Sequence, residues 1–256
     1  MEILVCVKRV PVPGVRFVLT EDEREVVTRN LGFTISPHEE CAVEAAVQLV
    51  EQHGGSSTVL TMGEPAAVEQ LRFAISMGVN EAVLIETDGG ECDAAATTAA
   101  IVEAVRAEQS AGVPFDALLF GNESADAGNY QVGLGVAHAL NLPCVVGIKA
   151  LDVQADGSVV AKREIAEGWE VYELALPAVF TVKEGVNLPR YPLLRGRLAA
   201  KKKEIKTYPA QGPGEAGLEM MAFKNPQETA SQVEVLGEGP GAAPRVAALL
   251  QEMGVL

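Results

Sequence analysis

The segment from Gly121 to Gly133, GNESADAGNYQVG, contains the residue types of a nucleotide-binding loop. It follows an apolar run and precedes a helical pattern, so its glycines would let a ligand approach the backbone and the helix start would offer N–H groups to a phosphate. Glu123 and Asp126 would repel a phosphate but suit ribose hydroxyls. Because neither a GK[ST] nor a GxGxxG pattern is present, an ordinary acidic loop is the alternative.

A second candidate is the segment CDAAATTAA, from Cys92 to Ala100. Asp93 can cap the helix predicted here, and Thr97 lies in its first turn. The small residues would allow a ligand or another stretch of backbone to approach closely. A tightly packed, alanine-rich helix would explain the same pattern.

A basic segment extends from Asn187 to Lys206 and contains seven of the twenty lysine and arginine residues. Pro189 and Pro192 predict that this segment lacks regular structure. The pair Leu193–Leu194 is apolar in a segment that cannot easily bury it. This combination favours a docking element for a partner protein over a solvated basic stretch.

Few residues suggest catalysis. The three histidines, His38, His53 and His138, show no metal-ligand spacing, and the sequence has no GxSxG, HExxH or CxxC pattern. We therefore expect no catalytic residues and no metal site, and a binding or carrier role rather than an enzyme.

The composition restricts the partners. The formal net charge of −15 disfavours nucleic acid and anionic membranes. No apolar run approaches the roughly 20 residues of a membrane span, so we expect no membrane insertion. The four cysteines have no motif spacing and the first residues read as a strand rather than a signal peptide, which predicts a cytoplasmic protein.

The apolar pattern predicts a doubly wound α/β fold. Five predicted strands, at residues 3–7, 58–62, 82–86, 117–120 and 144–148, alternate with helical patterns. This alternation predicts a parallel sheet of order 3-2-1-4-5 or a close relative, with the first and fourth strands as neighbours. Ligands bind at the carboxyl ends of strands where the winding reverses, which singles out Cys6 and the loop after Gly121.

The pattern changes after residue 150. Three β segments, at 159–164, 171–174 and 179–182, have no helices between them and predict a small antiparallel extension. We divide the chain into a nucleotide-binding domain (1–183), a docking arm (184–206) and an extended C-terminal tail with a short helix (207–256).

The motifs resemble those of the beta (small) subunits of electron transfer flavoproteins, a family that includes the FixA-type chains. They are VCVKRVP at 5–11, SPHEECAVEAAV at 36–47, LTMG at 60–63, FAISMGVNEAV at 73–83 and, most specifically, LPAV, NLPRY and AKKK in order within 162–205. The resemblance covers residues 1 to 206.

This resemblance implies the adenine nucleotide alpha hydrolase-like fold and a heterodimer with an alpha subunit that carries most of the FAD. It implies electron transfer from flavin dehydrogenases, such as the acyl-CoA dehydrogenases of fatty acid oxidation, to a quinone oxidoreductase or the respiratory chain. The implied cofactor-binding residues are Cys6, Ser36, Met62, Gly63, Thr97, Gly121, Asp126, Gln131, Val132 and Gly133. The implied docking residues are Tyr191, Leu193, Leu194 and Arg195, with Leu194 as the anchor.

Two alternatives remain open at this point. AMP occupies the beta-subunit site in ordinary members, whereas a second FAD replaces it in FixA-type, electron-bifurcating members. The QVG of residues 131–133 departs from the ordinary AMP pattern, and the D-x-x-A-T of residues 93–97 resembles FixA-type chains, whereas the loop GNESAD of residues 121–126 departs from the FixA-type pattern. A stand-alone nucleotide-binding protein of the universal-stress type would share the fold without needing the basic segment.

Overall fold

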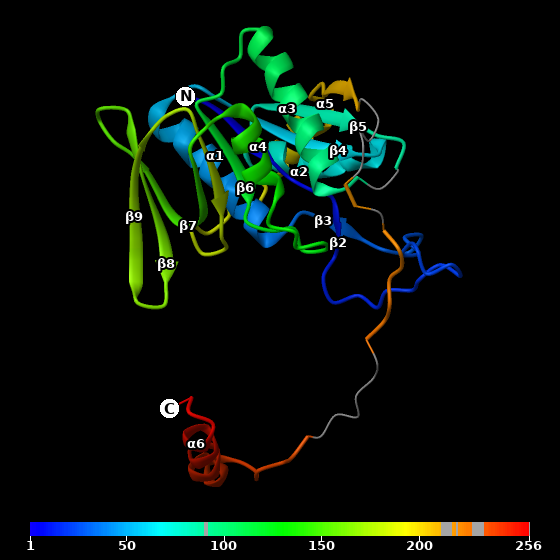
Figure 1. Cartoon of the computed structure of the whole chain (residues 1–256), viewed down its shortest axis with the longest axis vertical. Coiled ribbons are helices and arrows are strands. Elements are labelled where there is room, and N and C mark those ends of the chain that lie inside the picture. The colour runs from blue at the N-terminus through cyan, green and yellow to red at the C-terminus, as the bar shows by residue number, and fades with distance from the viewer. Residues whose placement is uncertain (90–91, 211–216, 219, 227–232, 256) are drawn as a thin grey trace.

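In the part of the chain that the structure describes, a nine-stranded sheet forms the centre (Figure 1). The computed structural model describes residues 1–89, 92–210, 217–218, 220–226 and 233–255. The sheet order is β11-β5-β4-β1-β6-β10-β7-β8-β9. In chain order these strands are β1 (Glu2–Cys6), β4 (Ser56–Gly63), β5 (Glu81–Glu86), β6 (Ala117–Gly121), β7 (Cys144–Val153), β8 (Ser158–Ile165), β9 (Gly168–Ala175), β10 (Ala178–Val182) and β11 (Lys206–Pro209).

Helices cover both faces of the parallel part of this sheet. Helices α1 (Pro37–His53) and α2 (Val68–Met77) pack on one face, and α3 (Ala94–Ser110) and α4 (Val132–Leu140) pack on the other. Successive strand residues point to opposite faces, so Ile3 and Val5 of β1 join the first core while Leu4 and Cys6 join the second. The doubly wound α/β prediction is confirmed.

The predicted strand order is correct for the first four strands, which correspond to β1, β4, β5 and β6. The prediction for residues 179–182 is wrong, because β10 lies inside the parallel sheet between β6 and β7. All five residues of β10 are buried. A short run that is apolar apart from one threonine is typical of a strand covered on both faces, which explains why β10 lies there.

The antiparallel extension consists of the second half of β7 with β8 and β9. Strand β7 runs parallel to β10 from Cys144 and pairs antiparallel with β8 from Ile148 onward. Strands β8 and β9 form the outer hairpin (Figure 1).

The basic segment is more regular than its prolines predicted. Residues from Leu194 to Lys202 form helix α5, and the chain then adds β11 in parallel to β5 at the sheet edge. Pro192 precedes the helix and therefore restricts only the residues before it. Ala200 is buried against α2, so tertiary packing completes a helix that the local sequence did not predict.

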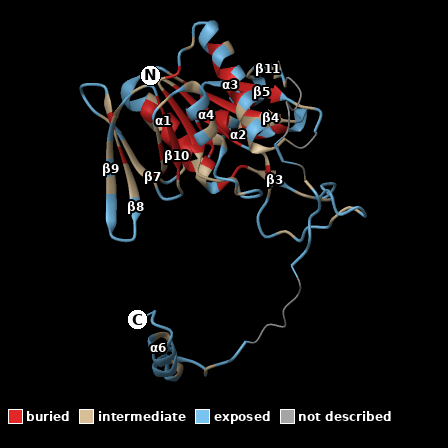
Figure 2. Cartoon of the chain, viewed as in Figure 1, coloured by how far each residue is buried: buried red, intermediate tan, exposed pale blue. Residues whose placement is uncertain are grey.

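Two further segments lie outside the sheet. Strands β2 (Val10–Pro11) and β3 (Phe33–Thr34) pair across the long charged excursion that follows β1. The tail ends in the predicted short helix, α6 (Ala243–Glu252), which follows the short 3-10 helix η2 (Pro240–Ala242). No residue of α6 is buried, whereas the central strands of the sheet and the helix faces that pack on them are buried (Figure 2).

Candidate functional site

The predicted site residues at the strand ends lie on three adjacent strands. Cys6, the last residue of β1, pairs with Leu60 of β4 and with Phe120 of β6. Met62 and Gly63 end β4, and Gly121 ends β6. The carboxyl ends of β4, β1 and β6 therefore form one edge, where the winding of the sheet reverses between β1 and β6 as the sequence predicted.

Ser36 joins this edge to the loop after β6. Its hydroxyl accepts a hydrogen bond from the N–H of Ala125 at 2.9 Å. Its own N–H donates to Glu39 Oε2 at 2.8 Å, which is one half of the capping box at the start of α1. The start of α1 and the loop of residues 121–128 are thereby held together.

Glu39 is a site residue that sequence reasoning treated only as a helix cap. Its other carboxylate oxygen, Oε1, accepts the N–H of Lys8 at 2.9 Å, so the side chain links α1 to the end of β1. Burial raises the pKa of Glu39 to about 8, although the N–H donors of Ser36 and Lys8 favour the ionised form. A Cβ at Gly121 would lie 2.7 Å from Glu39 Cγ, which explains why glycine ends β6.

Lys8 is a second residue that sequence reasoning missed, although its place directly after a buried strand was a usable signal. Its ammonium group lies 2.7 Å from Asp126 Oδ2. Burial alone would raise the pKa of Asp126, but the hydrogen bond and charge of Lys8 outweigh burial and lower that pKa. Asp126 is therefore ionised and paired, and Lys8 brings positive charge to an otherwise acidic loop.

The predicted residues at the start of α4 have two different roles. Gln131 is the N-terminal boundary residue of α4, and its side chain makes no capping hydrogen bond. The first-turn N–H groups, including that of Val132, thus face the loop without a side-chain cap. Gly133 allows close packing, because a Cβ there would lie 2.9 Å from Thr181 Cγ2.

Thr97 belongs to a separate part of the strand-end edge. Its hydroxyl donates to the carbonyl of Asp93 at 2.8 Å, and Asp93 Oδ1 caps α3 through the N–H of Ala96 at 2.7 Å. Asp93 Oδ2 also accepts the N–H groups of Gly217 and Leu218 at 2.8 and 3.0 Å, so the tail crosses the start of α3. Helix α3 follows β5, two strands from β1, and no contact joins Thr97 to Ser36 in the described part of the chain.

The four docking residues lie together at the start of α5. Tyr191, Leu193 and Leu194 are 81%, 74% and 73% exposed, and Arg195 is also exposed. Large apolar side chains this exposed, next to each other on a basic segment, are typical of an interaction site.

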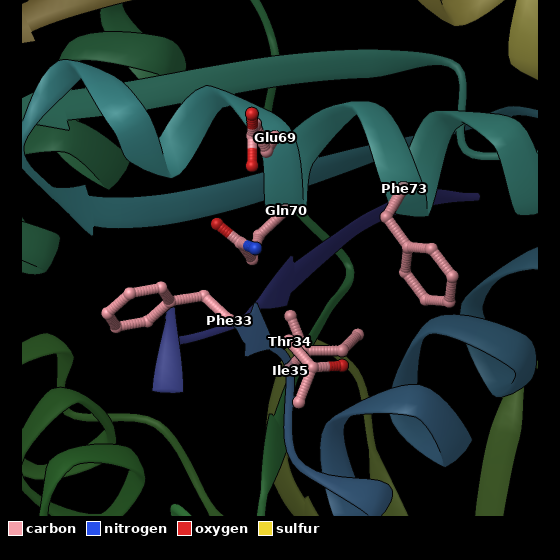
Figure 3. A pocket seen from close by; sticks show the side chains of 6 residues that line it. All are labelled: Phe33, Thr34, Ile35, Glu69, Gln70 and Phe73. Atoms are coloured by element: carbon pink, nitrogen blue, oxygen red, sulfur yellow. The ribbon is translucent and has the colours of Figure 1, made fainter. Parts of the chain in front are cut away.

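A small cavity lies elsewhere, between α2 and β3 (Figure 3). It has a volume of ≈ 230 Å³ and is lined by Phe33, Thr34, Ile35, Glu69, Gln70 and Phe73. Gln70 is buried and its Oε1 has no hydrogen-bond partner. None of the predicted site residues lines this cavity, and its volume is below the ≈ 300–1,000 Å³ of typical cofactor pockets.

Comparison with known proteins identifies the family. The profile of the family described as "Electron transfer flavoprotein domain" matches residues 25–212. The electron transfer flavoprotein subunit beta of Syntrophomonas wolfei is 31% identical over 248 residues, which cover 96% of this chain and 94% of that protein. The chain belongs to the electron transfer flavoprotein beta-subunit family.

Other beta-subunit relatives agree. The electron transfer flavoprotein subunit beta of Bacillus subtilis is 36% identical over 174 residues, covering 67% of this chain and 65% of that protein. Protein FixA of Azorhizobium caulinodans is 34% identical over 220 residues, covering 84% of this chain and 77% of that protein. The resemblance drawn from the sequence is confirmed, and the chain is an electron transfer flavoprotein subunit rather than a universal-stress-type protein.

Within the residues that the structure describes, no helix is long and apolar enough to span a bilayer.

Proposed function

We propose that this chain pairs with an alpha subunit to form a heterodimeric electron carrier. The dimer receives electrons from flavin dehydrogenases, such as acyl-CoA dehydrogenases, and delivers them to a quinone oxidoreductase or the respiratory chain. The observation that carries the proposal is the exposed pair Leu193–Leu194 at the start of basic helix α5, which suits an apolar pocket on a partner. Cys6, Cys41 and Cys144 form no disulfide, which supports a cytoplasmic location.

FAD, held mainly by the alpha subunit, supplies the redox chemistry when bound. This chain contributes binding surfaces and charges, and it acts as an electron-carrier subunit rather than an independent enzyme.

We propose that the strand-end site of this chain holds the AMP portion of a nucleotide. The donors fit a phosphate, because Lys8 supplies a cation and the first turn of α4 supplies N–H groups without a side-chain cap. The acceptors fit a ribose or base, because Asp126 is ionised and Ser36 has a hydroxyl within the same loop system. Cys6, Met62, Gly63, Gly121, Gln131, Val132 and Gly133 would form the surrounding walls.

A second FAD in place of AMP is the alternative for the same site. It is favoured by the D-x-x-A-T segment, in which Asp93 and Thr97 form the start of α3 beside the strand ends, and by the similarity to FixA. A larger ligand that extended from β1 toward β5 would reach these residues, whereas AMP alone would not need them.

The test is to coexpress the chain with the alpha subunit of its own genome, purify the dimer and identify the nucleotides released on denaturation. One FAD and one AMP per dimer supports the simple carrier. Two FAD per dimer supports the bifurcating alternative, and a dimer that contains no FAD overturns the proposal.

A further inference from the structure

Arg190 ties the segment that bears the exposed leucines to helix α1. Its Nε and main-chain N–H donate to Glu44 Oε2 at 2.9 and 3.0 Å, and its Nη2 donates to Glu44 Oε1 at 3.1 Å. Its Nη1 and Nη2 also reach Glu51 at 2.6 and 2.9 Å. Because a guanidinium pairs with a carboxylate in a fixed planar geometry, the bonds to Glu44 hold both the side chain and the backbone of Arg190 in one position, whereas Glu51 is largely exposed.

Glu44 makes this tether specific. It is 2% exposed, and its Oε1 also accepts Gln48 Nε2 at 2.8 Å. A buried carboxylate that has no partner is strongly destabilising. Releasing Arg190 from Glu44 therefore costs more free energy than breaking an exposed ion pair would. The hydrogen bonds of Glu51 and Glu44 raise the pKa of Arg190, so the guanidinium keeps its charge.

Helix α5 is tethered independently on the other side of the leucines. Arg72 Nη1 donates to the carbonyls of Ala200 and Lys201 at 3.2 and 2.6 Å. Gly196 lies against the backbone of Ser76, where a Cβ would clash. The exposed side chains of Tyr191, Leu193 and Leu194 lie between these two tethers.

We propose that Arg190, held by Glu44, is the positioning residue that presents Leu193 and Leu194 to the redox partner protein. This inference rests on the proposed function, because it assumes that these leucines dock. A segment fixed at both ends loses less conformational entropy when a partner binds it. The clamp therefore acts on recognition of the partner and not on the flavin.

The experiment uses the purified heterodimer with a flavin dehydrogenase as the varied electron donor. Arg190→Lys keeps the charge opposite Glu44 but loses the planar fork. We expect the KM for the dehydrogenase to rise about tenfold, equivalent to about 1.4 kcal/mol, with kcat and FAD content unchanged. Glu51→Gln is the matched control, because Glu51 is 57% exposed and its pair contributes little.

Trypsin provides a direct measure of the opened segment. Cleavage after Arg195 and Arg197, followed by mass spectrometry, is expected to be faster in Arg190→Lys than in wild type and in Glu51→Gln. If Arg190→Lys does not fold, the double variant Arg190→Met with Glu44→Gln removes both charges together and is expected to show the same rise in KM.

Leu194→Ala separates this inference from the proposed function. If Leu194→Ala raises KM and neither clamp variant does, the clamp is overturned and docking stands. If Leu194→Ala also leaves KM unchanged, the docking function itself fails. A fall in kcat or FAD content in Arg190→Lys would show a structural role only and overturn the inference.

The double variant Arg190→Lys with Leu194→Ala completes a double-mutant cycle, which measures whether the two residues act together. If the clamp acts through the placement of Leu194, the double variant is expected to be little worse than Leu194→Ala alone. Fully additive effects would overturn the coupling.

Discussion

Replacing Glu39 by Gln tests the buried carboxyl at the strand-end site. Glu39 is 5% exposed, and burial raises its pKa from the ordinary value of 4.5 to about 8. A difference of this size between the folded and unfolded chain corresponds to a free energy on the order of 5 kcal/mol. The amide has nearly the same shape as the carboxyl but does not ionise, so the substitution removes the titration. Its Nε2 cannot accept the N–H of Ser36 or Lys8 that a carboxyl oxygen accepts, which lowers stability by an amount that does not depend on pH.

The sign follows from proton uptake. Because the folded pKa is raised above the unfolded one, Glu39 binds a proton in the folded state between pH 4.5 and about 8 and not in the unfolded state. The contribution of Glu39 to stability is complete below pH 4.5, the ordinary pKa. It is lost as the pH rises through the folded-state pKa of about 8. The slope is at most about 1.4 kcal/mol per pH unit in this window.

The assay is urea unfolding of the purified dimer at several pH values across this window, for wild type, Glu39→Gln and Glu51→Gln. As the pH rises, we expect the free energy of unfolding of wild type to fall relative to that of Glu39→Gln, because only wild type loses the contribution of protonated Glu39. Glu51→Gln, an exposed carboxyl on the same helix, controls for a loss of charge. Infrared spectra with isotope-labelled glutamate should show a protonated carboxyl in wild type at neutral pH that Glu39→Gln lacks.

A difference between wild type and Glu39→Gln that does not change with pH would refute the reasoning. It would mean that the hydrogen bonds from the N–H groups of Ser36 and Lys8 outweigh burial and keep Glu39 ionised.

Three further predictions address the other features. Leu194→Ala should weaken docking by about 2 kcal/mol or more, which corresponds to a rise in KM of roughly 30-fold, without a measurable loss of thermal stability. Leu188, an 89% exposed leucine outside α5, is the control, and an equal effect of Leu188→Ala would contradict the anchor assignment. Gly121→Ala places a Cβ 2.7 Å from Glu39 Cγ and should lower the free energy of unfolding by about 1–3 kcal/mol. Gly241→Ala, whose Cβ meets open space, should not lower it, and equal melting temperatures for the two variants would argue against close packing at Gly121. Ser36→Ala removes the acceptor for the N–H of Ala125 and should speed nucleotide release from the dimer, measured by exchange with free nucleotide; an unchanged rate would separate Ser36 from the site.

The sequence was sufficient to predict strand order and helix starts where the local apolar pattern agrees with the observed burial. The alternation of apolar runs with capped helices predicted the order of β5, β4, β1 and β6, and Asp93 and Ser36 begin helices where their residue types predicted. The exposed leucines were predicted from their basic, proline-containing context, and the motif resemblance predicted the family that the comparisons identify.

The tertiary structure decided what local pattern leaves ambiguous. In the sequence, β10 looks like one more β segment after β9. Only its pairing with β6 and β7 shows that it belongs in the centre of the sheet. Helix α5 forms because Gly196 and Ala200 fit closely against α2, a contact between segments distant in sequence.

The same division holds for the site. The sequence by itself predicted which strand ends and which loop would hold a nucleotide, because residue types and strand order indicate those positions. It could not determine that Lys8 pairs with Asp126, that Glu39 is buried against the ends of β1 and β6, or that Arg190 reaches Glu44. These interactions join residues that only the folded chain brings together, and charge pairing and burial depend on that proximity rather than on spacing in the sequence.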